Sequence, residues 1–243
     1  SNCSKTDYNL RAPSGRNPKD FWNYSGGDYA GTWKKRGKGQ PFFTVYNIGD
    51  SHESRAFGDH KDESVDPKKM ILAPYHPDLP EMRNTYAKYA SAISRMDSLV
   101  GQAIENLKQD GLYENTIIVY NSDHGGVLAR SKRFLYSSGI HCPLIVRIPE
   151  KMKALYPKGK TPGSTMDRIV SFIDMPKTWV SLTGAERTKN FQGRIFLGPD
   201  TEPESNYHFS WRERADERFD NVRVMRDEQF AYHRNYAPFA PNG

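Results

Sequence analysis

The sequence is poor in cysteine and has no long apolar run. Its two cysteines, Cys3 and Cys142, are too few for a disulfide framework, and neither has the spacing of a metal ligand. No segment approaches the roughly 20 consecutive apolar residues that cross a bilayer. None combines a basic start with the apolar stretch of a signal peptide. These absences point away from a small disulfide scaffold and from a membrane-spanning protein.

The composition is that of a globular protein with a basic surface. Of the 243 residues, 36% are hydrophobic and 12% aromatic, and the net charge is +6 with a pI near 9.1. Such a balance suits anionic partners. We see no dense Lys/Arg stripe and no nucleic-acid motif. A sulfated or phosphorylated ligand therefore fits better than nucleic acid, which strongly salt-dependent duplex binding would reveal.

The most informative stretch is a short apolar run that ends in a polar turn. Residues 116–121 begin with four β-branched residues, Thr116-Ile117-Ile118-Val119, and this short, largely apolar run predicts a buried strand. The next residues are Ser122-Asp123-His124-Gly125-Gly126. Because ligands of open α/β sheets bind at the carboxyl ends of strands, Asp123 and His124 are candidate metal ligands. The alternative is a simple turn in which Asp123 bonds the backbone.

The remaining pattern predicts an α/β fold, with a mostly parallel or mixed sheet flanked by helices. A helix of roughly 30 residues is expected to begin with Asp78 as its N-cap and Glu81 three residues later, and to end at Gly111. Residues 54–77 look like a surface loop. Further strands are expected at 41–48, 143–148, 168–173, 207–211, 221–226 and 229–234. The fourth is followed by a charged turn at 212–218, and the last two are joined by a turn at Asp227-Glu228. We see no convincing linker, so residues 1–243 are predicted to form one domain.

The order of motifs around the central strand resembles the sulfatase family of the alkaline phosphatase superfamily. The matching features are the strand, the Ser-Asp-His-Gly turn, Lys132, and a run from Tyr136 through Gly139 into the Pro143-Leu144-Ile145-Val146 strand. The resemblance implies an alkaline-phosphatase-like fold and hydrolysis of sulfate esters, with a sulfated small molecule or glycan as substrate. By family analogy the compartment is periplasmic, extracellular or lysosomal; the sequence itself leaves it unknown.

The resemblance also assigns roles to individual residues. It implies calcium, or another divalent metal, held by Asp123 and His124. His52, which follows the predicted strand 41–48, and Lys132 take the places of sulfate contacts, and either could protonate the leaving alcohol. Further candidates are Lys5 for the formylglycine and sulfate, and Arg130 and Arg133 for more distant parts of the substrate. Asp7 stands where the family usually has a histidine two residues after the lysine.

The nucleophile that the family uses is not found in these residues. Sulfatases convert a cysteine or serine to formylglycine within a Cys/Ser-x-Pro/Ala-x-Arg motif. Cys3 is followed by Ser-Lys-Thr-Asp and Cys142 by Pro-Leu-Ile-Val, and no serine satisfies the pattern. Paired N-terminal aspartates are also missing. We therefore expect an interior fragment, without the nucleophile segment and the C-terminal subdomain, that is inactive by itself.

Two other functions fit the same motifs. A phosphodiesterase or phosphonate hydrolase of the superfamily would share the turn at residues 122–126, which we call the metal turn. A non-catalytic fragment that binds an anionic glycan would explain the missing nucleophile. The sequence also leaves the roles of two further features undecided. The aromatic residues Phe21, Trp22, Tyr24 and Trp33 could line a sugar site or pin a loop, and the charged turn 212–218 could lie over the active site or form a surface loop.

Overall fold

The computed structural model describes residues 1–3, 21–26, 32–57, 64–186, 189–215 and 218–239. The chain divides into two compact units, Ser1–Tyr113 and Glu114–Gly243, and each is described here by itself. That 1–243 form one domain stays a prediction. No helix in the described ranges is long and apolar enough to cross a bilayer.

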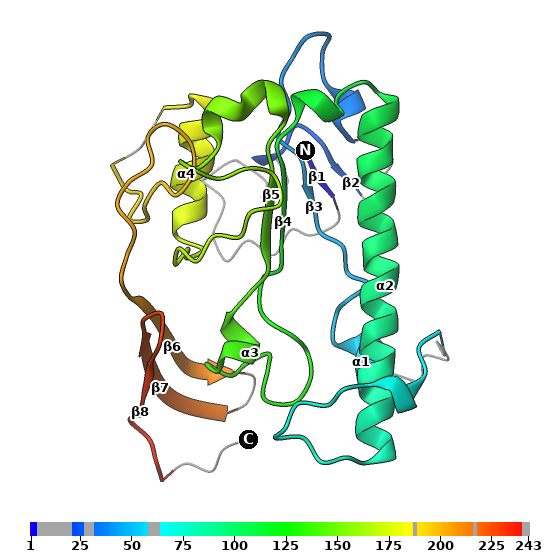
Figure 1. The fold of residues 1–243 in the computed structure, drawn as a ribbon, viewed down its shortest axis with the longest axis vertical. Coiled ribbons are helices and arrows are strands. Elements are labelled where there is room, and N and C mark those ends of the chain that lie inside the picture. Colours follow the sequence, from blue (N-terminus) through cyan, green and yellow to red (C-terminus); the bar gives the residue numbers. More distant parts are fainter. Residues whose placement is uncertain (4–20, 27–31, 58–63, 187–188, 216–217, 240–243) are drawn as a thin grey trace. The chain divides into compact units, whose positions relative to one another are not determined.

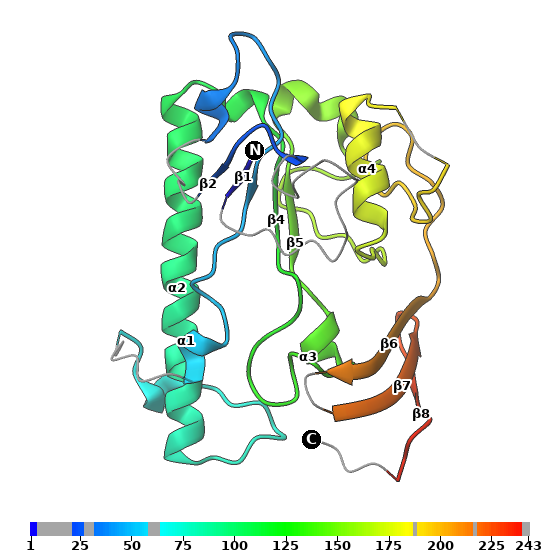
Figure 2. The same cartoon turned by 180° about the vertical axis from the view of Figure 1, so that it is seen from behind.

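The first unit contains a small parallel sheet. Its strands are β1 (Asn2–Cys3), β2 (Ser25–Gly26) and β3 (Val45–Tyr46), in the order β2-β1-β3 (Figure 2). The register pairs Asn2 with both Ser25 and Val45. The predicted buried strand 41–48 is therefore wrong in length: only two of its residues pair, and Phe43 is 52% exposed.

Trp33 is a packing residue of this unit. It lies in the 3₁₀ helix η2 (Thr32–Lys35) and is only 2% exposed. Its ring contacts the rings of Phe42 and Tyr46, with centroids 5.9 and 6.1 Å away. Its indole Nε1 donates to Asp110 Oδ2 over 2.7 Å. Of the two roles left open for Trp33, the structure supports the pinning of a loop, because a sugar cannot stack on a buried ring.

The long helix α2 (Pro80–Gln109) is the main element of the first unit (Figure 1). Before it come α1 (Ser54–Phe57), which packs against it, and η3 (Pro67–Lys69), so segment 54–77 is more ordered than predicted. The N-cap is Leu79, and the prediction of Asp78 is wrong. The Asp78 carboxylate instead accepts two bonds from Arg83, of 2.5 and 2.7 Å. An arginine fork binds a carboxylate more strongly than one backbone N–H does.

The predicted end of α2 is confirmed. Gly111 has a positive φ of 69°. Its N–H donates to Lys108 O, and the N–H of Leu112 donates to Leu107 O, both over 2.9 Å. This pair of bonds is the Schellman motif, which favours glycine because the left-handed conformation strains residues with a Cβ.

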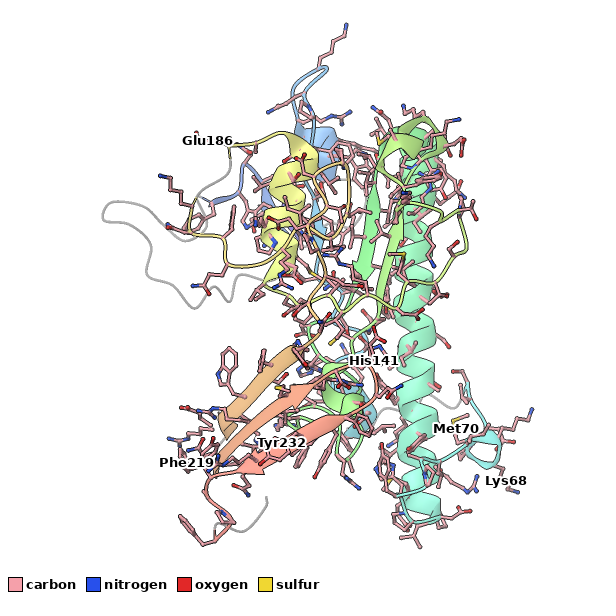
Figure 3. The ribbon with its side chains drawn as sticks, turned by 60° about the vertical axis from the view of Figure 1, so that its left-hand side comes forward. Lys68, Met70, His141, Glu186, Phe219 and Tyr232 are labelled. Carbon is pink, nitrogen blue, oxygen red and sulfur yellow. The ribbon has the colours of Figure 1, made fainter. Side chains whose placement is uncertain are left out.

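The second unit begins, after the turn η4 (Tyr113–Asn115), with two predicted strands that pair. They are β4 (Ile118–Asn121) and β5 (Leu144–Arg147), which run antiparallel with Val119 opposite Val146. Between them the chain forms the short helix α3 (Ser137–Ile140). His141 lies at the end of α3, where the chain turns towards β5 (Figure 3).

A short 3₁₀ segment, η5 (Glu150–Leu155), and α4 (Asp174–Thr183) follow. The predicted strand 168–173 is wrong, and only the helix after it forms. Asp174 accepts backbone N–H groups of Ser171 and Arg194, each over 2.8 Å. The buried Thr178 hydroxyl accepts the N–H of Phe196 over 3.2 Å. These bonds fasten the segment around Arg194 and Phe196 to α4.

The last described part is an antiparallel sheet of β6 (His208–Ala215), β7 (Arg218–Arg226) and β8 (Ala231–Asn235), in that order. The predicted charged turn 212–218 is wrong, because residues up to Ala215 belong to β6 and Arg218 begins β7. The turn at Asp227 is confirmed: Asp227 Oδ1 accepts the N–H groups of Gln229 and Phe230 over 2.8 and 2.6 Å. Phe219 and Tyr232 lie on the neighbouring strands β7 and β8 (Figure 3).

Candidate active site

The turn after β4 is clamped to the backbone of α3. The N–H of Gly125 donates to Gly139 O over 2.8 Å, and the N–H of Gly126 donates to Ser138 O over 3.1 Å. The approach is so close that a Cβ on Gly125 would lie 2.0 Å from Ser138 O. Only glycine fits there, which explains the glycine after His124 and fixes the turn that carries Asp123 and His124.

Asp123 and His124 place two possible metal-ligand atoms, a carboxylate oxygen and a ring nitrogen, close to each other. The Asp123 carboxylate is 73% exposed, and its Oδ1 lies 3.8 Å from His124 Nε2. His124 Nδ1 lies 2.7 Å from the carbonyl oxygen of Gly125. A carbonyl can only accept, so Nδ1 carries the hydrogen and Nε2 keeps its lone pair. Fixing one ring nitrogen in this way is how proteins prepare a histidine for a metal.

The geometry fits two ligands of a single cation. Calcium ligands lie about 2.3–2.6 Å from the ion, so two ligands at roughly a right angle stand about 3.3–3.7 Å apart. The 3.8 Å separation of Oδ1 and Nε2 is close to this value. Two donors do not complete the six to eight ligands that calcium takes. Within the described ranges no third His, Cys, Asp or Glu joins them.

Lys132 is tied to the same turn. Its N–H donates to Gly126 O over 2.8 Å, and Gly126 is also bonded to Ser138. The Lys132 side chain is half-buried. The structure therefore places Asp123, His124 and Lys132 in one hydrogen-bonded segment, although seven residues lie between His124 and Lys132 in the chain.

Arg130 is held on the loop between the turn and α3. Its backbone is left-handed, with φ 63°, and its carbonyl accepts the hydroxyl of Ser138 over 2.6 Å. The guanidinium lies over the ring of Tyr136 at 4.5 Å, a cation–π contact. Tyr136 in turn contacts the ring of His233 on β8, at 5.7 Å. Arg133 is also left-handed, with φ 77°.

His52 belongs to the first unit, in the turn that follows β3. Its Nδ1 accepts the N–H of Ser54 over 3.3 Å and lies 3.0 Å from the Ser54 hydroxyl. An acceptor at Nδ1 puts the hydrogen of the neutral ring on Nε2. His52 is exposed, so its Nε2–H is a donor at the surface of a turn after β3. Lys5 lies outside the described residues.

Cys142 is a neighbour of the metal turn that the sequence did not connect with it. Burial raises the pKa of the Cys142 thiol above its ordinary value, a hydrogen bond with Ser122 opposes this, and the charge of Asp123 raises it further. A thiol of raised pKa stays protonated at neutral pH and is a poor nucleophile and metal ligand. The apolar context Ile140 to Leu144 was the only sequence signal of this state.

Comparison with known proteins decides the family. A sequence profile of the sulfatase family matches residues 25–185, more than half of the chain. The chain belongs to the sulfatase family. It is 33% identical over 274 aligned positions to an ulvan-active sulfatase of Formosa agariphila, covering 98% of this chain and 43% of that protein. It is also 33% identical over 131 positions to an N-acetylglucosamine-6-O-sulfatase of Bacteroides thetaiotaomicron, covering 52% of this chain and 22% of that protein.

Solved structures confirm the predicted alkaline-phosphatase-like α/β fold. A crystal structure of a Bacteroides fragilis protein assigned as a sulfatase superposes with a TM-score of 0.60 at 24% identity, over 85% of this chain and 46% of that one. A second structure, in complex with its substrate D-glucosamine-2-N,6-O-disulfate, gives 0.54 at 24% identity, over 66% of this chain and 33% of that one. The sulfatase-family chain spans less than half the length of these relatives.

Proposed function

We propose that the full-length protein is a sulfuric ester hydrolase that removes sulfate from a sulfated sugar. The observation that carries this proposal is the turn after β4, in which Asp123 Oδ1 and His124 Nε2 stand 3.8 Å apart and Lys132 is fastened through Gly126. The family and the named activities of the two relatives on ulvan and on N-acetylglucosamine-6-O-sulfate support it.

In this proposal Asp123 and His124 hold a divalent cation, with calcium as the expected ion. The exposed carboxylate supplies a hard oxygen donor, and the imidazole supplies the Nε2 lone pair. The bound ion would polarise the sulfate and favour the ionised nucleophile, which in this family is a formylglycine. Neither Cys3 nor Cys142 has the sequence context of that residue, so we place it in a part of the protein beyond these 243 residues.

The cationic and donor side chains have separate tasks. The Lys132 ammonium neutralises charge on the sulfate and on the oxygen from which it leaves. The same ammonium would protonate the leaving alcohol. His52 Nε2–H would donate a hydrogen bond to the leaving oxygen, because its Nδ1 is already engaged with Ser54. Lys5 is proposed as a further contact of the nucleophile and sulfate. Arg130, held over Tyr136, would bind a more distant anionic part of the substrate.

The proposal is tested with Asp123→Asn and Lys132→Ala in the full-length protein. Asparagine keeps the size of aspartate but removes the charge, so the turn should fold. Sulfate release from 4-nitrophenyl sulfate and from N-acetylglucosamine-6-O-sulfate should fall by about 10²–10³-fold or more in each variant.

The matched controls are Asp167→Asn and Lys151→Ala, which change exposed residues of the same unit. From the two controls we expect sulfate release within about twofold of the parent. All four variants should show unchanged circular dichroism. Normal sulfate release from either site variant would remove the assignment. Release of phosphate from a phosphodiester or phosphonate substrate, without sulfate release, would favour the related hydrolases. Binding of a sulfated sugar without turnover by the parent would favour a non-catalytic glycan binder.

A further inference from the structure

A pocket of about 420 Å³ lies in the second unit, between the loop at 133–140 and strand β6. Its size falls within the range of about 300–1,000 Å³ typical of small-molecule sites. The residues that matter here are Arg133, Phe134 and Gly139 from the loop side and Trp211, Arg212 and Arg214 from β6. We call it the arginine pocket. Apart from Arg133, which the sequence had suggested as a contact for a distant part of the substrate, it uses none of the residues to which the proposed sulfatase site assigns a role.

Arg212 is the centre of the pocket wall. Its side chain is only 10% exposed, and its guanidinium packs over the ring of Phe134 at 4.8 Å. Nη1 lies 3.2 Å from Asp220 Oδ2, so one end of the guanidinium is paired. Nε is buried and has no hydrogen-bond partner among the described residues. The edge formed by Nε and Nη2 is the fork with which arginine binds carboxylate or sulfate groups, and such a group would satisfy the missing bond.

The lining is positively charged and has an aromatic face. It contains three arginines and one glutamate, a net charge of +2. Asp220 reduces this to +1, and the glutamate, Glu213, is itself paired with Arg223 on β7. Trp211 is 69% exposed. An exposed indole beside cationic donors is suited to a sugar ring that carries an oxyanion, since the ring packs on the aromatic face.

The pocket adjoins the metal turn. Gly139 lines the pocket, and its carbonyl accepts the N–H of Gly125, the residue after His124. A Cβ on Gly139 would lie 2.2 Å from Phe134 O and 2.3 Å from Ser131 O, so only glycine fits at this position. One residue of backbone therefore joins the proposed sulfate site to the arginine pocket.

We propose that the arginine pocket is a saccharide subsite for a second anionic group of the same glycan, either a carboxylate or a further sulfate. Arg212 binds that group through its Nε–Nη2 edge, and Trp211 packs against the sugar ring. The inference rests on the proposed function, because it assumes that a sulfated sugar occupies the neighbouring site. It deepens that function by requiring a substrate with two anionic groups.

The test is calorimetric binding to the full-length protein of three ligands that differ in their second charge. N-acetyl-D-glucosamine-6-O-sulfate has none, D-glucosamine-2-N,6-O-disulfate has a second sulfate, and a chondroitin 6-sulfate disaccharide has a carboxylate. At least one of the latter two should bind 10-fold or more tightly than the first. The ligand that shows the gain identifies the second group.

Arg212→Lys keeps a cation beside Asp220 but loses the planar fork, and should reduce the gain to less than threefold. Trp211→Ala removes an exposed ring, so this variant should fold even if Arg212→Lys does not. It should also reduce the gain in affinity. Arg234→Lys on β8 is the matched control, since that arginine lies over Tyr236 and does not line the pocket. It should keep the full gain.

Equal binding of all three ligands overturns the proposal, and so does a gain that persists in both Arg212→Lys and Trp211→Ala. Failure of the proposed function is seen separately, as sulfate release that survives Asp123→Asn. The subsite can therefore fail while the sulfatase assignment stands.

Discussion

Two histidines named as candidate site residues, one in each unit, hold their ring hydrogens on opposite nitrogens. His124 places its hydrogen on Nδ1, facing Gly125 O at 2.7 Å, and keeps a lone pair on Nε2. His52 accepts the N–H of Ser54 at Nδ1 and keeps its hydrogen on Nε2. One ring thus presents an acceptor, which suits a metal, and the other a donor, which suits a leaving group. This difference supports the proposed division of roles.

The glycine at position 139 should not tolerate even one methyl group. Gly139→Ala would place a Cβ 2.2 and 2.3 Å from two carbonyl oxygens, and backbone atoms cannot swing aside as a flexible side chain can. We expect a loss of about 2–4 kcal/mol in the free energy of unfolding, measured by urea denaturation, because the loop must move. Sulfate release should fall as well, since Gly139 holds the metal turn.

The control for this substitution is Gly49→Ala in the first unit. A Cβ at position 49 meets nothing within 4 Å, and the backbone there is not left-handed. Its free energy of unfolding should stay within about 0.5 kcal/mol of the parent or rise slightly. Equal effects of the two substitutions would contradict the close approach at Gly139.

At the scale of elements, the end of α2 is held by a charge-assisted hydrogen bond. The indole of Trp33 holds the pKa of Asp110 below its ordinary value of 3.8, with Lys34 adding to the effect. The folded protein therefore binds this proton less readily than the unfolded chain does. The stabilisation is fully present above pH 3.8 and is lost as the pH falls towards the lowered pKa.

Asp110→Asn should accordingly cost about 1 kcal/mol of stability near pH 7, the usual size of one such bond at a partly exposed site. The difference between parent and variant should be constant down to about pH 5 and shrink below the ordinary pKa. Urea denaturation at pH 7, 5 and 3 measures it. Asp97→Asn, on the exposed side of the same helix, should show no such pH dependence. A difference that grows at low pH would contradict the assignment.

The C-terminal sheet shows why a charged segment was misread. Residues 212–218 have the composition of a solvated turn, but Arg212 finds Asp220 on the next strand and is almost entirely buried. The register places Arg212 opposite Val222, with an irregularity before Arg214. A partner two positions away on a neighbouring strand is set by register, which composition does not report.

At the scale of the whole molecule, binding of a cation to the folded protein should raise its free energy of unfolding. A ligand that binds only the folded state stabilises it by about 2.7 kcal/mol at 100 times its dissociation constant. We expect a chelator to lower the thermal midpoint of the full-length protein and calcium to restore it.

The metal ligands make this expectation specific. In Asp123→Asn the chelator and calcium should have little effect on the midpoint, whereas Asp167→Asn should respond as the parent does. A calcium response that is equally large in both variants would place the cation at another site. The readout is independent of turnover, so it separates metal binding from catalysis.

The sequence alone determined the elements whose signals are local. The strand–turn at 116–126, the end of α2 at Gly111, the hairpin turn at Asp227 and the family resemblance all follow from neighbouring residues, because steric limits on φ and short-range bonds act within a few positions. The structure and the comparisons bear out these elements and the fold class. The burial predicted for the strand is wrong, because β4 has no fully buried residue and Asn121 is exposed. The candidate site residues were named from the same local patterns.

Only the tertiary structure decided which distant residues meet. It fastened Gly125 and Gly126 to α3, buried Trp33 against Asp110, and assembled the arginine pocket from a loop and a strand about 80 residues apart. Each outcome is a competition between partners far apart in the chain, in which the stronger or better-buried contact prevails. A pattern of neighbouring residues cannot predict such a contact, because the partner residue lies elsewhere in the chain.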